Sequence, residues 1–455
     1  MASQLTLSLM MGPLTPIPVP RSVMEALTQV SVTSASSGSP GSFSLNFSTS
    51  KVSDITNDLL PSGYFDPPTR VVISATLNGA TTVLIDGVIT THDVVPSDEA
   101  GKSTLSIKGE DLTRMMDLID FSSLIAYPGM PYEARVALIV AKYSALYGIL
   151  PMVIPSVMLF VKNPVEGIDG QVGTDLAYVK MLAERVGYTF FLMPGPEPGM
   201  SLAYWGPKLQ AMIPFLAPPT PFAIDWDGSS NVESLQFSFD GFKKTLFVVL
   251  IKVGDVPVPL PIQVPDVTPI SPPLGAKIPI PLKLTPITGF SPYSPIEAGA
   301  MALARAVEAA NVVSGRGTLD VLRYGSILSP RTVIEVKGAG ITYDGSYYIE
   351  SVTHTIKQGS YKQDFSLLRN ALIAQGSSGL APLSSGGAVQ QLPGLETPAA
   401  QPTQGPSPIP AAPAPSPPLP NPASGGPLPA LPAASPPVPS SGASLATSLP
   451  ASPTS

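Results

Sequence analysis

The sequence predicts a mainly β protein with an α/β insertion, in which two strand-rich regions flank a helical one. Alternating or β-branched segments mark strands in residues 1–110 and 231–375, a pattern typical of half-buried strands. Apolar residues at helical spacing dominate residues 111–230. Residues 376–455 consist largely of proline, alanine and serine, so we expect a disordered tail there. These four ranges are the expected domains.

The first strand-rich region is expected to form a small antiparallel barrel or sandwich. Its apolar segments are separated by turn sequences such as SSGSPG and LNGA, which favour strands joined by tight connections. The number of such segments is sufficient for either architecture. The expected strands are residues 4–10, 29–35, 42–48, 70–77, 82–91 and 102–109.

The middle region changes to a helical pattern. In its last helical segment Thr174 or Asp175 stands where an N-cap belongs, and Gly187 stands where a left-handed residue ends a helix. A strand over residues 188–193 should follow this helix. The helical segments are EDLTRMMDL, PYEARVALIVAKYSALYG and the first part of TDLAYVKMLAERVGYTFFLM.

The second strand-rich region also contains a helix and an apolar proline-rich run. Small and aliphatic residues recur at helical spacing over residues 295–313. Residues 253–290 combine prolines with apolar side chains, so we expect this excursion to lie extended along a protein surface. The expected strands lie in ESLQFSFDGF, KKTLFVVLIKV and RTVIEVKG.

A hairpin over residues 343–370 closes this region and contains His354, one of only two histidines in the chain. Period two assigns Tyr348, Val352, His354 and Ile356 to one face of its first strand, and the other face to Tyr347, Ile349, Ser351, Thr353 and Thr355. Gly359 stands in the turn, where a positive φ is needed. Because its face is mainly apolar, we expect His354 to be a hydrogen-bonded structural residue.

Composition excludes several classes of site and partner. The chain has no cysteine and only His92 and His354 as histidines, which excludes disulfides, thiolate nucleophiles and imidazole-rich metal sites. A net charge of −7 with no basic cluster argues against nucleic-acid binding. The uncharged run 143–161 is interrupted by Pro151 and Pro155, so we expect a buried helix and strand there and no membrane span. The apolar start has no basic n-region, which argues against a signal peptide.

Two glycine-containing motifs only resemble nucleotide-binding loops. Residues 100–104, AGKST, match the end of a phosphate-binding loop, but Pro96 occupies the position of its first glycine and a strand follows in place of a helix. The glycines at 338, 340 and 345 do not have dinucleotide-binding spacing. We expect them to form turns.

No arrangement of residues indicates catalysis. Both histidines fall on expected strands and no G-x-S-x-G sequence occurs, so a serine hydrolase is not indicated. Asp98 and Glu99 lie in a polar turn, where solvated acids are the ordinary explanation. We therefore predict no catalytic, cofactor-binding or metal-binding residues, and no enzymatic activity.

Three segments together resemble the late control protein D family, the baseplate hubs of contractile injection systems. TDLAYVKMLAERVGYTFFL, residues 174–192, is similar to the helix-to-strand element of the family. Residues 317–370 resemble its closing β module, with a Tyr-Asp-Gly turn, a Val-x-His strand and a Tyr-x-x-x-Phe-x-Leu-x-Arg strand. Residues 84–118 resemble the end of its first barrel. The resemblance covers residues 1–375.

This resemblance implies a structural hub with two tail-tube-like barrels per chain. Three chains would form a pseudo-sixfold ring that mates with a hexameric inner tube on one side and a trimeric spike on the other. Assembly in the bacterial cytoplasm into an injection particle, together with other baseplate proteins, is also implied. No spike repeats follow the hub module, so the spike is expected to be a separate protein. The alternative from composition is a surface or secreted β-sandwich adhesin on a proline-rich stalk.

Overall fold

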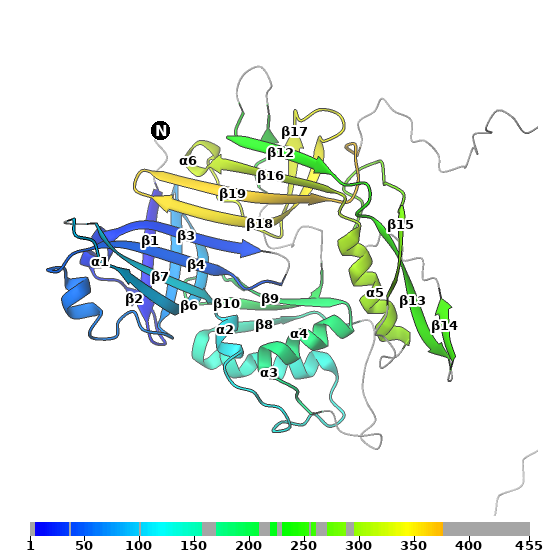
Figure 1. Ribbon diagram of the computed structural model, residues 1–455, viewed down its shortest axis with the longest axis horizontal. Coiled ribbons are helices and arrows are strands. Elements are labelled where there is room, and N and C mark those ends of the chain that lie inside the picture. The colour runs from blue at the N-terminus through cyan, green and yellow to red at the C-terminus, as the bar shows by residue number, and fades with distance from the viewer. Residues whose placement is uncertain are drawn as a thin grey trace, which may run out of the picture. The chain divides into compact units, whose positions relative to one another are not determined.

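The computed structural model describes residues 5–35, 38–99, 102–156, 170–208, 219–224, 230–253, 256–260, 271–287 and 295–375. The fold is mainly β, with a helical region between two groups of strands, which confirms the predicted fold class (Figure 1). The helices in the described ranges are α1 Arg21–Ala26, the π-helix η1 Ile55–Leu59, α2 Thr113–Met116, α3 Tyr132–Tyr147, α4 Asp175–Arg185, α5 Pro295–Ala309 and α6 Val321–Tyr324.

The strands of the described ranges form three sheets. The largest contains β1 Leu5–Gly12, β2 Ile17–Pro18, β3 Leu27–Ala35, β4 Ser42–Thr49, β5 Arg70–Leu77, β6 Ala80–Val95, β7 Ser103–Asp111, β11 Phe222–Ala223, β12 Ser234–Phe239, β16 Val313–Asp320, β17 Val333–Lys337, β18 Gly345–Lys357 and β19 Ser360–Arg369. The second contains β8 Ile149–Val153, β9 Tyr188–Pro194 and β10 Ser201–Pro207. The third contains β13 Thr245–Val253, β14 Val256–Leu260 and β15 Lys283–Ile287.

The large sheet joins the two strand-rich regions directly. Its order β12-β16-β19-β18-β3-β4-β7-β6-β5-β1-β2 places β18 of the second region beside β3 of the first. The two strands run antiparallel, with Thr353 opposite Thr33 and Thr355 opposite Ser31. Figure 1 shows this junction between the yellow hairpin and the blue strands. No local sequence pattern predicts this continuity.

The two regions repeat one arrangement of strands. In the first, β3 pairs with β4, β4 with β7, β7 with β6, and β6 with β5. In the second, β12 pairs with β16, β16 with β19, β19 with β18, and β18 with β17. All of these pairs are antiparallel, and corresponding strands occur in the same order along the chain. The five strands β3 to β7 therefore correspond to β12, β16, β17, β18 and β19.

A bulge at the same place in each repeat strengthens this correspondence. The pairing of β6 with β7 shifts register between Ile89 and Thr91, and that of β18 with β19 shifts between Ile349 and Ser351. A bulge inserts one residue and so exchanges the two faces of a strand. The predicted period-two assignment is therefore wrong before the bulge of β18. Tyr347 and Ile349 belong to the apolar core, together with Val352, Ile356 and Tyr361 beyond the bulge.

The strands of both regions surround one apolar core. It includes Leu45 and Ile73 from the first region and Val352 and Leu367 from the second, each at most 2% exposed. Burial of this apolar area is the main force that stabilises the sheet. The core is continuous beneath the β18–β3 junction, so the two repeats are held together by side chains as well as by backbone pairing.

The helical insertion has a core of its own. Helices α3 and α4 cover the β8-β10-β9 sheet, and Val136, Leu182 and Trp205 are buried between them. The Thr174 side chain accepts a hydrogen bond from the Ala177 backbone N–H at 3.2 Å, and Gly187 has a φ of 71°. Both predicted helix ends of α4 are therefore confirmed.

A buried ion pair attaches this insertion to the first repeat. The Arg70 guanidinium on β5 donates to both Asp86 carboxylate oxygens at 2.8 and 2.7 Å. It also donates to the carbonyls of Tyr147 and Gly199 in the insertion, at 2.8 and 2.9 Å. Burial raises the pKa of Asp86, and Arg70 opposes this shift. One guanidinium thus satisfies groups in both regions.

One predicted helix ends earlier than expected, and other predicted segments lie wholly or partly outside the described residues. The helix expected over residues 295–313 ends at Ala309, because Val313 already begins β16, which pairs on both sides. Within the excursion 253–290, β14 and β15 are extended as predicted, and its remaining parts are only partly described. The tail, 376–455, lies outside the described residues. The domain boundaries at 110 and 230 remain predictions.

Candidate functional site

The candidate site is one face of the sheet formed by β12, β16, β19, β18, β3, β4, β7 and the second half of β6. We call it the polar face. Two rows of directly opposed residues cross it, and every member is exposed or half-buried. The first row is Ser234, Thr318, Asp364, Thr353, Thr33, Ser42 and Glu110. The second row is Asp320, Lys362, Thr355, Ser31, Ser44, Lys108 and Thr91.

The row between these two points the other way and is buried. It consists of Leu319, Gln363, His354, Val32, Phe43, Gly109 and Ile89. Successive residues of a strand face opposite sides. Hydroxyl and charged residues at every second position therefore produce one polar, solvent-accessible face. The same strand order carries this pattern through both repeats. The polar face is thus continuous across the strands of both repeats that form it.

Side chains of the polar face bond mainly to one another across strands. At the junction, the hydroxyls of Thr33 and Thr353 lie 3.1 Å apart. The Thr318 hydroxyl donates to Asp364 at 2.6 Å, and the Lys108 ammonium donates to Asp93 at 3.2 Å. These pairs satisfy donors and neutralise charge locally, so both rows present polar groups, most of them short. Such a surface lacks the contiguous apolar patch that marks most protein-binding sites.

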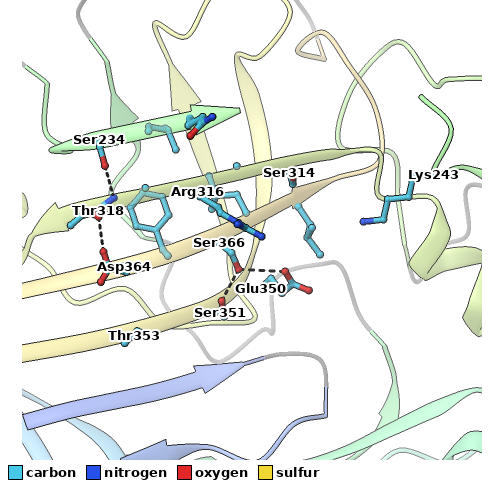
Figure 2. A pocket seen from close by; sticks show the side chains of 17 residues that line it. Ser234, Lys243, Ser314, Arg316, Thr318, Glu350, Ser351, Thr353, Asp364 and Ser366 are labelled. Carbon is cyan, nitrogen blue, oxygen red and sulfur yellow. Dashed lines mark hydrogen bonds between the residues drawn. The ribbon is translucent and has the colours of Figure 1, made fainter. Parts of the chain in front are cut away.

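An open groove of about 830 Å³ lies over β12, β16, β19 and β18. Figure 2 shows Arg316, Ser366, Ser351 and Glu350 in its middle, with Lys243 at one end. The Ser351 and Ser366 hydroxyls are 2.6 Å apart, and Ser366 donates to Glu350 at 3.4 Å. The groove is therefore part of the polar face, and its lining combines hydroxyls and charged side chains of both signs with a few apolar residues, such as Leu368.

A buried arginine supports the junction from behind. Arg331 is 7% exposed, and its guanidinium donates to the Ala35 carbonyl at the end of β3. Its Cζ lies 3.9 Å from the centre of the Phe191 ring in β9. Burial lowers the pKa of Arg331 to about 10, so the side chain remains a cation at neutral pH. Arg331 thereby links both repeats to the insertion.

His354 is a structural residue beneath the polar face. It is 3% exposed, and its Nδ1 lies 2.8 Å from the Tyr361 hydroxyl and 3.2 Å from Gln363 Nε2. Gln363 Nε2 also donates to the Leu328 carbonyl. Burial lowers the pKa of His354 to about 4, so the ring is neutral at physiological pH. This geometry is that of a buried structural side chain that is hydrogen-bonded within the core.

The other residues considered from sequence are not brought together. His92 lies on β6, with Nδ1 4.0 Å from Asp66, and Glu99 pairs with Lys102 at the surface. Gly338, Gly340 and Gly345 have positive φ in or beside the connection of β17 to β18, which confirms their assignment to turns. Within the described ranges no group of three metal-ligating side chains occurs, and no helix there is long and apolar enough to cross a membrane.

Sequence reasoning missed the feature that defines the site. The polar alternation of each strand was visible, but the pairing of β18 with β3 joins residues more than three hundred positions apart. Two signals were present in the sequence: the similar order of strands in the two regions and the excess of serine and threonine at alternate positions.

Comparison with solved structures identifies the fold. A tail protein from Neisseria meningitidis superposes with a TM-score of 0.53 and 12% identity, over 80% of this chain and 97% of the other. The 43 kDa tail protein of prophage MuSo2 from Shewanella oneidensis gives 0.51 and 12%, over 81% and 100%. The chain has a phage tail protein fold. The Francisella PdpA–VgrG complex contains the same fold, at 0.52 and 8%, over 81% of this chain and 53% of the matched chain.

Comparison by sequence adds no relative. No protein-family model matches the chain, and no curated protein does either. The tail-protein fold therefore rests on the arrangement of elements, and it agrees with the resemblance carried by residues 174–192 and 317–370.

Proposed function

We propose that this chain is the structural hub of a contractile, phage-tail-like injection system. Three copies form a ring in which six repeats alternate, and the ring adapts a trimeric spike to a hexameric inner tube. The chain acts through its surfaces and performs no catalysis. It works as a component of the assembled particle, in contact with other baseplate proteins.

The observation that carries this proposal is the repeated strand arrangement joined in one sheet. A ring that contacts a sixfold tube needs six similar units, and a threefold partner needs three identical ones. A chain with two corresponding repeats supplies both from three copies. The fold shared with tail proteins and with the PdpA–VgrG complex supports the same assignment.

The polar face is the lining of the central channel in this proposal. A continuous sheet with its apolar side in the core presents mainly the hydroxyl and charged rows inward. Short hydrated side chains give a moving cargo few apolar contacts, and paired charges reduce net attraction of either sign.

The mass of the purified chain in solution tests the proposal, alone and mixed with its spike protein. A hub gives the mass of three copies, and negative-stain images show rings with a central channel. A chain that stays monomeric under both conditions, or a ring with any other number of copies, contradicts it. A monomer would instead fit the adhesin alternative.

A further inference from the structure

The polar face ends on each side in a strand segment that has a partner on one side only within the described residues. Strand β12 pairs with β16 alone. In β6, residues 80–88 pair with β5, whereas residues 91–95 pair only with β7. Each edge thus presents a row of backbone N–H and C=O groups, which is a template for pairing with another strand.

Both edges also expose apolar side chains. Val94 and Val95 at the β6 edge are 51% and 59% exposed, and Phe239 at the β12 edge is 44% exposed. Natural edge strands usually carry charges or prolines that prevent pairing. Apolar residues at an unpaired edge indicate that the edge is covered in the working assembly.

The chain contains a model for such a pairing, because its own β18–β3 junction joins corresponding edges. Strand β18 corresponds to β6, and β3 corresponds to β12. The β6 edge of one copy and the β12 edge of another are therefore related to each other as β18 is to β3. Among the strands of the polar face, the β12 edge and residues 91–95 of β6 are the two segments that this junction would join next.

The bulges fix the register of this second junction. Thr91 and Ser351 each follow a bulge. Thr91 lies opposite Lys108 of β7, and Ser351 lies opposite Ser366 of the corresponding strand β19. Counting from them, Asp93 corresponds to Thr353 and Val95 to Thr355.

The other side of the junction is aligned through the same strands. Lys108 lies opposite Ser44, which lies opposite Ser31. Ser366 lies opposite Arg316, which lies opposite Gln236. Gln236 therefore corresponds to Ser31, and Ser238 to Thr33.

We infer that residues 91–95 of one copy pair antiparallel with β12 of the next copy, with Asp93 opposite Ser238 and Val95 opposite Gln236. In this register Val94 lies opposite Phe237 on the core side, as His354 lies opposite Val32 at the internal junction. The pairing continues the polar face from copy to copy. The inference rests on the proposed function only for the number of copies that closes the ring.

Disulfide crosslinking in the full-length chain tests the register. The chain has no cysteine, so introduced pairs are the only thiols. Asp93→Cys/Ser238→Cys places both thiols at exposed positions, and mild oxidation should link neighbouring copies. Val95→Cys/Gln236→Cys tests the next pair of the same register, and circular dichroism checks that each variant is folded.

Two controls accompany these variants. Thr33→Cys/Thr353→Cys is the same chemistry at the internal junction, where the two hydroxyls are 3.1 Å apart, and it should form a link within one chain. Asp93→Cys/Ser234→Cys is displaced by roughly 14 Å along the strand, too far for a disulfide. The predicted pairs should give on the order of tenfold more linked product than the displaced pair, because only they meet the geometric requirement.

The outcomes separate this inference from the proposed function. A covalent three-chain product supports both, whereas a ladder beyond three supports the pairing and contradicts the three-copy ring. A three-copy assembly that links no better at the predicted pairs than at the displaced pair overturns the pairing alone. A monomer that does not link overturns both. Linking by the single variant Ser238→Cys would show that β12 of one copy pairs with β12 of another copy. That result would also overturn the inference.

Discussion

Single polar residues beneath the sheet are buried in its core and contribute to its packing and hydrogen bonding. His354 is the clearest case, because its ring is enclosed, lies within hydrogen-bond distance of Tyr361 and Gln363 at Nδ1, and is held neutral by burial. A neutral ring needs no counter-ion in the core, whereas a protonated one would remain unpaired there. The residue should therefore affect the pH dependence of stability.

We expect the free energy of unfolding to fall between pH 6.5 and pH 4 because of His354. The unfolded ring takes up a proton below its ordinary pKa of 6.5, while the folded ring stays neutral down to about pH 4. The folded state therefore loses on the order of 3 kcal/mol as pH falls through this window. His354→Gln should cost about 1–3 kcal/mol at pH 7 but should lose stability less steeply toward pH 4, as measured by urea unfolding at each pH.

The matched control is His92→Gln, since the His92 side chain is 33% exposed. This variant removes an imidazole outside the enclosed core and is the comparison for the slope of His354→Gln. If His354→Gln and the unchanged chain had the same slope, protonation of His354 would not govern acid unfolding.

At the scale of elements, one buried ion pair contributes to the attachment of the insertion to the first repeat. Arg70 and Asp86 are both almost fully buried, and Arg70 also holds the carbonyls at the end of α3 and before β10. A buried pair adds little net stability, but loss of one member leaves the other charge without compensation.

We expect Arg70→Met to lower the free energy of unfolding by about 3–5 kcal/mol. Arg70→Met/Asp86→Leu should be more stable than Arg70→Met alone, because it removes the orphaned carboxylate as well. Denaturant unfolding of both variants measures the difference. The control is Arg21→Met, which breaks the ion pair of Arg21 with Glu25. The Arg21 side chain is 91% exposed, so stability should remain almost unchanged. A loss of less than 1 kcal/mol in Arg70→Met would contradict a supporting role for the pair.

Local patterns predicted the elements well, because each depends on neighbours in sequence. The N-cap at Thr174, the left-handed Gly187 and the turn at Gly359 are all confirmed. Periodicity could not predict the bulges near Ile89 and Ile349, because a bulge is decided by the partner strand. It therefore assigned Tyr347 and Ile349 to the wrong face.

At the scale of the whole molecule, the polar face depends on pairings that no local pattern contains. Thr33 and Thr353 are neighbours only because both repeats share a sheet. The family resemblance implied two similar β units, yet the continuous polar face needed the strand order. The edges too depend on the strand order and could not be predicted from local patterns.

We expect the melting temperature to rise with protein concentration, because association stabilises the folded chain by mass action. For three copies the gain is about 1 kcal/mol per tenfold increase, which corresponds to roughly 1–2 °C in a chain of this size. Calorimetry at two concentrations measures it. In the oxidised Asp93→Cys/Ser238→Cys variant the dependence should disappear, whereas a concentration-independent melting temperature in the unmodified chain would argue against association.

The connections within the two repeats are very unequal. Residues 36–41 join β3 to β4, whereas residues 240–312 join their counterparts β12 and β16 and include the β13–β15 sheet and α5. A hairpin tolerates long insertions at its tip far more readily than changes within its strands. The surface of the long connection can therefore change in evolution without disturbing β12 and β16. Grafting this connection between related chains should transfer whatever binding specificity it carries, while the strands of the sheet remain interchangeable.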